Sequence, residues 1–455
     1  MYPIFEFPVV GGGMIIALIA TFHILPCHLA TGGFWITYFL ERKAYAENDA
    51  DLLEFLKKFT LMVLIFCFVT GSLTGVGIWF ASTIISPRAI SGLIHNYVWG
   101  WATEWVFFLI EIVTIYIYYY TFGKISRKAH LRIGLLYAMA AWLSMVIITG
   151  ILAFMMTPGK WAETGNFFDG FFNPTYWPQL FFRTSMMFAI AGAYAAVVAS
   201  FIKNLKTRKT VIKTAGAWGL GGLLAAGLFA LWYYHQLPAR TLEIIDAFAY
   251  AKNMLHVSLG VAVIAGIYFV TLLLGFVNIA RPLVTIAMTV VIFIGIGGGE
   301  SVREIGRRPY LIPGYLYSNQ IIAHEVKNKG ISSEVDAFTE GGILSHYYFI
   351  PDSLRQVNDK NYLQAGEVIA KLECVICHTM QDNGRSSLPG LIKDMGMTSA
   401  EDLFYFLESL GDYPYMPKFA GSEVERRATA TFLSKLAGDE TAAEVDPQWI
   451  LHGDE

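Results

Sequence analysis

Residues 283–310 decide the fold, and they read LVTIAMTVVIFIGIGGGESVREIGRRPY. The first part, 283–299, contains no Lys, Arg, Asp or Glu, whereas charged residues crowd the stretch from Glu300 to Arg308. An apolar helix of roughly 20 residues is long enough to cross the ~30 Å hydrocarbon core of a membrane. This stretch is therefore predicted to be a membrane-spanning helix that ends at a strongly charged interface.

Seven further apolar runs precede this stretch and account for most of the chain up to residue 300. The eight runs cover residues 12–40, 59–82, 98–122, 132–155, 179–202, 214–234, 249–276 and 283–299. Of the 455 residues, 55% are hydrophobic and 15% are charged, which is far more apolar than a typical soluble domain. The sequence predicts an all-α fold, a polytopic membrane helical bundle with about eight transmembrane helices.

Lys and Arg are distributed unequally between the loops. The loops after the first, third, fifth and seventh runs hold fourteen of them, and the loops of the other set hold four. Because short basic loops stay on the cytoplasmic side, the N-terminus and everything after about residue 300 are expected outside. Only His130, among ten histidines, is expected in a cytoplasmic loop. The N-terminus shows no basic segment or small-residue cleavage site, so the first helix is expected to remain in place.

A second signature lies beyond the bundle, in Cys374-Val375-Ile376-Cys377-His378. In a C-x-x-C-H motif the two thiols bond to the haem vinyl groups, and the adjacent His provides the proximal iron ligand. The alternatives are a redox dithiol or half of a zinc site, but a zinc site needs a second ligand pair that this region lacks. We therefore expect one covalent haem c, and its attachment outside the cytoplasm agrees with the predicted orientation.

The surroundings of this motif are those of a small, acidic, soluble domain. Residues 361–372 have the pattern of a short amphipathic helix, and the chain from residue 355 onward carries 17 Asp or Glu against 9 Lys or Arg. Met416 stands in a Tyr-Met-Pro context 38 residues after His378. This resembles a class I cytochrome c, in which such a Met is the distal iron ligand. The predicted domains are 1–310 for the membrane part, 311–358 for an extracytoplasmic linker and 359–455 for a monohaem cytochrome c domain.

Ionisable side chains inside the apolar runs are costly in lipid and indicate function. These side chains, with one Met beside them, are His23 and His28 in the first run, Glu104 and Glu111 in the third, Arg183 at the start of the fifth, Lys252, Met254 and His256 in the seventh, and Glu300, Arg303, Glu304 and Arg307 after the eighth. A lone intramembrane His can equally be a hydrogen-bonded packing residue, and terminal arginines can simply anchor a helix. Taken together the set favours buried haem, because iron takes such ligands and haem propionates need cationic partners.

Three stretches resemble subunit I of the cytochrome bd oxidase family. Phe22-His23-Ile24-Leu25 resembles the family's segment whose His ligates an active-site haem. Glu104 and Glu111 resemble the family's two glutamates on the third helix, one near the haem d iron and one in the proton route. Residues 304–310, EIGRRPY, are similar to the family's E-x-G-R-x-P-aromatic motif, whose Glu ligates the high-spin haem b. The resemblance implies one or more haem b, with haem d as the alternative at the active site, and Arg307 as a cofactor-binding residue.

The departures from that family concern how electrons arrive. Where the family has Phe-x-His-Thr with a low-spin haem ligand, this chain has Phe181-Phe182-Arg183-Thr184. Met254 resembles the family's other ligand to that haem, and His256 is a candidate replacement ligand. The family's long quinol loop is reduced to about residues 235–248, and its ninth helix is replaced by the haem c domain. The sequence therefore predicts that haem c takes the place of quinol as the electron input.

Two functions remain open at this point. The first is a bd-like oxidase subunit that accepts electrons through its own haem c, passes them to membrane haems held by His23 and Glu304, and reduces oxygen, with Glu104 and Glu111 as the catalytic carboxylates that deliver protons. The second is an electron-relay subunit, without oxygen chemistry, between a haem c and a quinone or a larger respiratory complex. A cytoplasmic signalling domain, which a haem sensor would need, is not indicated.

Location and partners follow from the same features. We expect a multi-pass protein of the bacterial cytoplasmic (inner) membrane with its cytochrome c domain on the periplasmic side. The resemblance implies a partner like subunit II, and the acidic haem c domain favours a basic redox partner outside the cytoplasm. Nothing in the composition points to nucleic acid.

Overall fold

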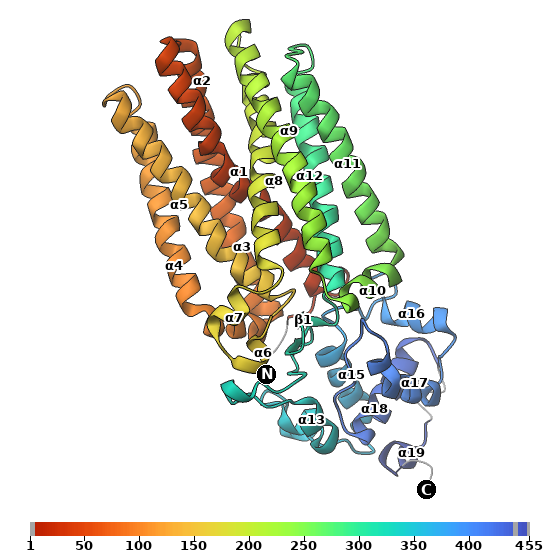
Figure 1. Ribbon diagram of the computed structural model, residues 1–455. Coiled ribbons are helices and arrows are strands. Elements are labelled where there is room, and N and C mark those ends of the chain that lie inside the picture. The colour runs from red at the N-terminus through yellow and green to blue at the C-terminus, as the bar shows by residue number, and fades with distance from the viewer. Residues whose placement is uncertain (1–4, 440–444, 453–455) are drawn as a thin grey trace.

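The computed structural model describes residues 5–439 and 445–452 and has two parts, a tall helical bundle and a smaller, mostly helical domain at one end of it (Figure 1). Of the described residues, 5–306 belong to the bundle, and those from 359 onward form the smaller domain. The chain passes between the two parts through a short two-stranded sheet, β1 (Tyr310–Ile312) and β2 (Leu316–Tyr317), which pair antiparallel.

Eight helical spans in the described residues are long and apolar enough to cross a membrane. They are α1 (Gly12–Glu47), α2 to α3 (Ala50–Ile85), α4 (Pro87–Tyr120), α5 (Arg127–Phe154), α8 (Tyr176–Ala199), α9 (Leu205–His235), α11 (Ala249–Leu273) and α12 (Pro282–Gly306). The second span is one continuous helix built from α2 (Ala50–Ile65), a π-helical turn η1 (Phe66–Thr70) and α3 (Gly71–Ile85). The predicted all-α bundle of eight membrane-length helices is confirmed.

Several of these helices extend past the apolar runs that predict them. α1 continues to Glu47 rather than stopping near residue 40, and α4 begins at Pro87 rather than near residue 98. Hydropathy marks only the lipid-compatible part of a helix, whereas the backbone ladder continues until a cap ends it. Asn48 ends α1, because its backbone adopts the left-handed conformation with φ 52°. Asp49 then begins α2, because its carboxylate accepts the Leu52 backbone N–H at 2.9 Å.

Small residues bring α8 and α9 into close contact near the centre of the bundle. A Cβ atom on Gly192 would lie 2.7 Å from the Ala215 carbonyl oxygen, and one on Gly222 would lie 2.6 Å from the Ser185 carbonyl oxygen. Glycine at both positions therefore permits the close approach of two helix backbones, as in other membrane helix pairs.

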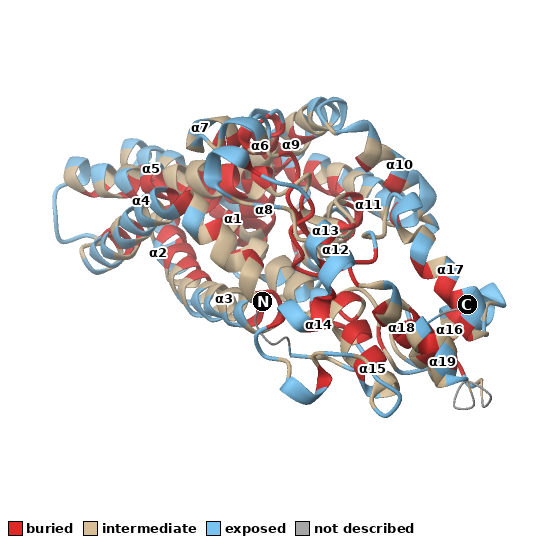
Figure 2. Cartoon of the chain, turned by 90° about the horizontal axis from the view of Figure 1, so that it is seen from below, coloured by how far each residue is buried: buried red, intermediate tan, exposed pale blue. Residues whose placement is uncertain are grey.

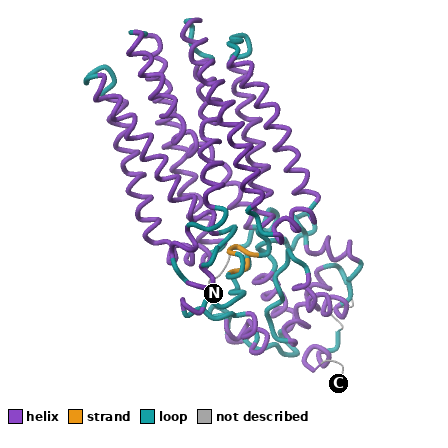
Figure 3. The backbone as a smooth tube through the Cα atoms, in the orientation of Figure 1, coloured by secondary structure: helices purple, strands orange, loops and turns teal. Residues whose placement is uncertain are grey.

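The two ends of the bundle differ in structure (Figure 3). The far end has short connections, between α1 and α2, α4 and α5, α8 and α9, and α11 and α12. The near end carries the short helices α6 (Trp161–Thr164), α7 (Phe167–Phe171) and α10 (Ala239–Ala247) together with the C-terminal domain. The basic loops counted in the sequence all lie at the far end, so the assignment of that end to the cytoplasm stays a consistent prediction.

One ionisable cluster at the far end is buried rather than in a loop. His130 lies in the first turns of α5 and is 1% exposed, so its predicted place in a cytoplasmic loop is wrong. Its Nδ1 forms an ion pair with the Glu41 carboxylate of α1, which also accepts the Tyr118 hydroxyl of α4 at 2.7 Å. The three side chains join α1, α4 and α5 at this end.

The stretch from β1 to residue 358 folds onto both parts of the protein. Its further elements are η2 (Lys327–Lys329), α13 (Val335–Gly341), α14 (Ile343–His346) and η3 (Asp352–Leu354). Ile312 and Leu316 are buried in an apolar cluster of the bundle, and Ile343 is buried in the core of the C-terminal domain. Arg88 at the start of α4 donates two hydrogen bonds to the Glu334 carboxylate, at 2.6 and 2.8 Å. The predicted linker is thus packed and ion-paired along its length.

The C-terminal domain has its own apolar core, at the meeting point of α14, α15 and α18 (Figure 2). Its elements are α15 (Tyr362–Glu373), α16 (Leu388–Met395), α17 (Ala400–Glu408), η4 (Ser409–Asp412), α18 (Glu423–Leu436) and α19 (Pro447–His452). α15 matches the amphipathic helix expected at 361–372. The Glu425 carboxylate accepts the backbone N–H groups of Ile343 and Leu344, at 2.8 and 2.9 Å, and so fixes α14 to α18.

Candidate haem sites

The C-x-x-C-H motif follows α15 directly and forms one tight turn. The backbone N–H groups of Cys377 and His378 donate to the Cys374 carbonyl at 3.1 and 2.9 Å, which holds the motif together. The His378 Nδ1 lies 3.0 Å from the Ser386 carbonyl oxygen, to which it can only donate, so Nε2 keeps its lone pair free for iron. Burial lowers the pKa of His378 and favours the neutral, metal-binding imidazole. The residues of the motif fit a covalent haem.

The loop that carries Met416 docks on the near end of the bundle. Arg240 of α10 donates from Nη2 to the Pro414 carbonyl oxygen at 2.8 Å. The Tyr415 ring packs edge-on against Phe248 at the start of α11, with ring centroids 5.0 Å apart. Met416 itself is half-buried within this loop. The predicted distal ligand is therefore held by contacts with the membrane helices as well as by its own domain.

Glu373, next to the first cysteine, is a buried carboxyl that sequence reasoning missed. It is 7% exposed, and its oxygens accept the Ala420 backbone N–H at 3.2 and 3.3 Å. Burial raises the pKa of Glu373 to about 8. A helix-terminal Glu gives no signal of this in the sequence, because its burial depends on the packing of a segment 47 residues away.

At the end of α12, carboxylates and guanidinium groups alternate along one side of the helix. Arg303 donates to Glu300 and to Glu304, both at 2.8 Å, and Arg307 pairs with the other oxygen of Glu304. One nitrogen of Arg303, Nη1, is buried without a hydrogen-bond partner among the described residues. Glu304 is thus present as a paired carboxylate that could instead bind iron, and the arginines beside it could then pair with other anions.

His23 lies on α1 and faces α3. The Thr74 hydroxyl donates to the Thr70 carbonyl oxygen at 2.6 Å, so it accepts from the His23 Nδ1, 2.9 Å away. This arrangement puts the proton on Nδ1 and leaves Nε2 as the free nitrogen, with the Cys27 sulfur 3.2 Å from it. A histidine held in this way by a neighbouring hydroxyl has the tautomer that metal ligation needs.

Glu104 and Glu111 of α4 meet at one serine of α5. The Ser144 hydroxyl donates to Glu104 Oε1 at 2.9 Å, and Ser144 also lies near the Glu111 carboxyl. Glu111 is 6% exposed, and both carboxyls are in electrostatic contact with Cys27 of α1. The two carboxyls and the serine between them form a short polar path from the bundle interior toward α1, and Ser144 is a second residue that sequence reasoning missed.

Of the three residues proposed around a low-spin haem, Arg183 and Met254 both lie near α12, whereas His256 does not. Arg183 of α8 is in electrostatic range of Glu300, and His28 is in range of both. Met254 of α11 is half-buried beside α12, where Gly298 gives room for it. His256 is exposed on the outer surface of α11. Arg183 therefore sits with the α12 charges, and His256 has no access to the interior of this chain.

An open cavity connects the motif of the C-terminal domain with the charged end of α12. It has a volume of about 200 Å³ and is lined by Glu304, Arg307 and Arg308 on one side and by Cys377 and Arg385 on another. The predicted haem c attachment and the predicted Glu304 site therefore border one cavity.

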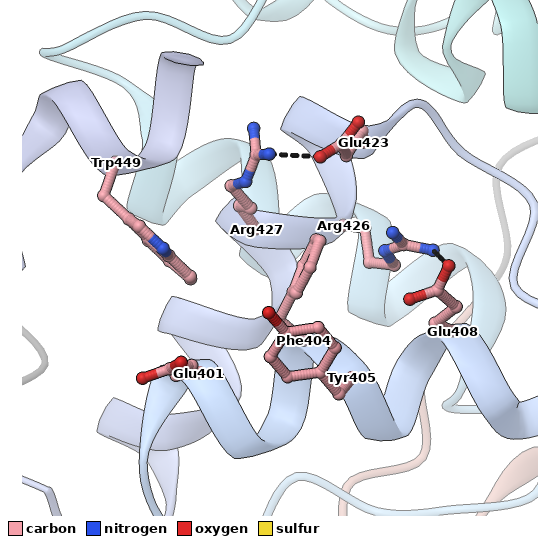
Figure 4. Close-up of a pocket in the computed structure, with 8 residues that line it drawn as sticks. All are labelled: Glu401, Phe404, Tyr405, Glu408, Glu423, Arg426, Arg427 and Trp449. Atoms are coloured by element: carbon pink, nitrogen blue, oxygen red, sulfur yellow. Dashed lines mark hydrogen bonds and ion pairs between the residues drawn. The ribbon is translucent and has the colours of Figure 1, made fainter. Parts of the chain in front are cut away.

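A second hollow lies wholly within the C-terminal domain, between α17, α18 and α19 (Figure 4). Arg426 lies over the Phe404 ring, 4.3 Å from its centroid, and pairs with Glu408 at 3.6 Å. Arg427 pairs with Glu423 on the same helix. None of the predicted haem ligands lines this hollow.

The bundle and its buried His, Glu and Arg side chains define an integral membrane protein with an interior suited to haem. A family model described as cytochrome bd terminal oxidase subunit I matches residues 14–243, just over half of the chain. The chain belongs to this family. It is accordingly a respiratory oxidase-like membrane haem protein, of a family that uses haems b and d and whose members typically pair with a subunit II.

The comparison with solved structures agrees on the fold. The structure of bd oxidase from Geobacillus thermodenitrificans matches with a TM-score of 0.59 and 16% sequence identity, over 72% of this chain and 92% of that chain. At this identity the likeness shows a shared fold and no more. The comparison with curated proteins finds no match. The resemblance of the membrane part to subunit I is thus confirmed, whereas the α12 motif and the C-terminal domain lie beyond the matched residues 14–243.

Proposed function

We propose that this protein is a bd-like oxidase subunit that receives electrons through a covalent haem c on its own C-terminal domain. The observation that carries the proposal is the shared cavity, because Cys377 of the C-x-x-C-H motif and Glu304 of the α12 motif both line it. In this proposal electrons pass from haem c to the membrane haem across this shared cavity, so that no separate quinol site is needed.

Each ligand set is supported by its surroundings. His378 offers Nε2 because its Nδ1 is committed to the Ser386 carbonyl, and His23 offers Nε2 because its Nδ1 is committed to Thr74. Met416 is the second proposed iron ligand of haem c, and Glu304 is a proposed iron ligand of a membrane haem. Arg307, which already pairs with Glu304, is the proposed cationic partner of a membrane haem.

When bound, the haems would carry four electrons to one oxygen molecule, which with four protons gives two water molecules. The chain's own part in that reaction is to hold protons. The Ser144 hydroxyl donates to Glu104 and lies near Glu111, and we propose that a proton passes between the two carboxyls through this hydroxyl group. A carboxyl in a buried, partly polar site can take up and release such a proton.

The difference from the family at the low-spin haem site, where Arg183 replaces a liganding His, agrees with the proposed electron input through haem c. Arg183 stands where the family has a liganding His, and it faces Glu300 instead. We propose that Arg183 holds an anionic group of a membrane haem together with the α12 arginines, and that Met254 remains a possible ligand on the α11 side. His256, exposed on α11, would act only toward a partner subunit.

The proposed setting is the bacterial cytoplasmic membrane, with the C-terminal domain on the periplasmic side. The basic loops at the far end of the bundle support this orientation. A subunit II-like partner would cover apolar side chains that this chain leaves exposed, and a basic redox protein would be the donor to the acidic C-terminal domain.

Oxygen consumption by the purified protein tests the proposal. With ascorbate and a soluble phenylenediamine mediator as donor, we expect steady oxygen uptake that H378A abolishes and the exposed-residue control H95A preserves. A short-chain quinol should support little uptake. Quinol-driven uptake that is unaffected by H378A would contradict electron input through haem c. No uptake with either donor would favour the alternative, an electron-relay subunit of a larger complex.

A further inference from the structure

The cavity between the two parts of the protein contains more cationic groups than the carboxylates there can balance. Its charged lining consists of Arg303, Arg307, Arg308 and Arg385 with Glu300 and Glu304. Glu300 and Glu304 are already paired with Arg303 and Arg307. Arg308 and Arg385 have no carboxylate partner and no side-chain hydrogen bond among the described residues, although Arg308 lies over the Phe248 ring, 5.9 Å from its centroid.

These two unpaired arginines come from different parts of the chain. Arg308 follows α12 of the bundle, whereas Arg385 lies between the C-x-x-C-H motif and α16. The backbone N–H of Arg385 donates to the Val9 carbonyl oxygen at 2.9 Å, which fixes its loop to the segment before α1. Burial, and after it the positive charge of Arg308, lower the pKa of Arg385, so the two guanidinium groups are close enough to repel.

A third donor in the same cavity also lacks an acceptor. The Nη1 of Arg303 is buried without a partner among the described residues. A buried donor without a partner is costly. Arg308 is half-buried and Arg385 is exposed at the edge of the cavity, and their like charges repel unless an anion lies between them. Apolar residues, among them Ile16, Ala17 and Leu93, form much of the remaining wall. The lining therefore suits a ligand with an apolar body and two carboxylates.

We propose that Arg308 and Arg385 together bind the propionates of the membrane haem whose iron ligand is Glu304, so that the C-terminal domain completes a haem site of the bundle. Glu304 lies in the last turn of α12 and Arg308 in the turn that follows the helix, and both line the same cavity. The inference rests on the proposed function in taking that ligand to be haem.

The propionates of the covalent haem c itself are poor candidates for these arginines. Cys377 would bond to a vinyl group, and in haem the vinyl groups and the propionates lie at opposite edges of the porphyrin. The cavity next to Cys377 therefore meets the vinyl edge of haem c. Arg385 would link the two haems, because it lies near Cys377 on one side and would bind a propionate of the second haem on the other.

The test uses the full-length protein, with covalent haem c as an internal standard. The variants are R385Q, R385K and the double variant R308Q/R385Q, with K393Q as the matched control. Lys393 is a cation of the same domain that pairs with Asp382 at 3.2 Å and does not line the cavity. Two quantities are measured, the ratio of acid-acetone-extractable to covalent haem and the midpoint potential of each haem by spectroelectrochemical titration.

We expect R385Q to lower the midpoint potential of one extractable haem by more than that of haem c, because loss of a cation beside the propionates stabilises the ferric state. R385K should restore most of the potential, and K393Q should leave it unchanged. The double variant should lose one extractable haem per covalent haem. A change confined to haem c, or no change in any variant, would overturn the proposal.

Two further outcomes separate this inference from its alternatives. An anionic lipid headgroup offers similar chemistry, so the titration is repeated in vesicles of phosphatidylcholine with and without phosphatidylglycerol. A wild-type potential that depends on the anionic lipid, and loses this dependence in R385Q, would overturn the haem assignment in favour of lipid. If the protein carries no covalent haem at all, the proposed function fails, but extractable haem per protein in R308Q/R385Q still decides the inference.

Discussion

Replacement of Glu373 by Gln should remove a pH dependence from the stability of the C-terminal domain. The carboxyl is 7% exposed, and burial raises its pKa from 4.5 to about 8. The folded state therefore binds one proton more than the unfolded state between these two values. The contribution of the Glu373 carboxyl to the free energy of unfolding is full below pH 4.5. It falls as the pH rises toward 8, by about 1.4 kcal/mol per pH unit, or on the order of 5 kcal/mol in all.

The assay is equilibrium unfolding in guanidinium chloride between pH 4.5 and pH 8.5, followed through the visible absorption of the covalent haem. That absorption reports the C-terminal domain alone, because the membrane helices hold no covalent haem in this account. E373Q should flatten the decline with pH and make the domain more stable than wild type at pH 8. The control is E367Q on the same helix, where a half-exposed Glu pairs with Lys371 at 2.6 Å. Equal slopes in wild type and E373Q would refute the reasoning.

Four further predictions concern the two haem ligands, the proton path and the far end of the bundle. H378A should abolish the covalent haem while the extractable haem stays, and an unchanged reduced c-type absorption band would disprove the assignment. E304A should remove or convert one extractable haem, so an unaltered haem content and spectrum would count against Glu304 as a ligand. E111Q should slow oxygen uptake by about 10²-fold or more at constant haem content, as expected when a proton-transferring group is lost; full activity would exclude it from the path. H130A should destabilise the bundle by about 3–5 kcal/mol in thermal unfolding, because it leaves the Glu41 carboxylate buried without its cationic partner, and an unshifted melting temperature would show that the pair contributes little.

The bundle could be predicted from the sequence because lipid imposes a simple rule. A segment that crosses a membrane must be helical and apolar over its whole length, so hydropathy alone finds the eight spans. The C-x-x-C-H motif is equally local, because the two vinyl bonds and the iron ligand fix its spacing. The ends of the helices were harder to place, as α1 and α4 show, because a helix continues through polar residues until a cap stops it.

What the sequence did not reveal depends on contacts between distant residues. His130 and Glu41 are 89 residues apart in the sequence. His130 follows a basic loop, and only the packing of α5 on α1 buries it beside Glu41, with which it forms an ion pair. Ser144 gives no signal as a serine among apolar residues, yet it lies between Glu104 and Glu111. Arg385 looks like an ordinary surface residue of a soluble domain until the docking of that domain brings it to the α12 cavity. His256 differs from its prediction in the opposite sense. Its place in an apolar run predicts an interior ligand, but it is exposed on the surface of α11.

The central claim is that one chain carries both a covalent haem c and an oxygen-reactive haem in its membrane part. A reduced spectrum and a carbon monoxide difference spectrum of the purified protein, with acid-acetone extraction to separate covalent from extractable haem, test it most directly. The account expects one covalent haem per chain and an extractable high-spin haem, b or d, whose spectrum changes with carbon monoxide. Only extractable haem, or extractable haem that is low-spin and inert to carbon monoxide, would contradict it.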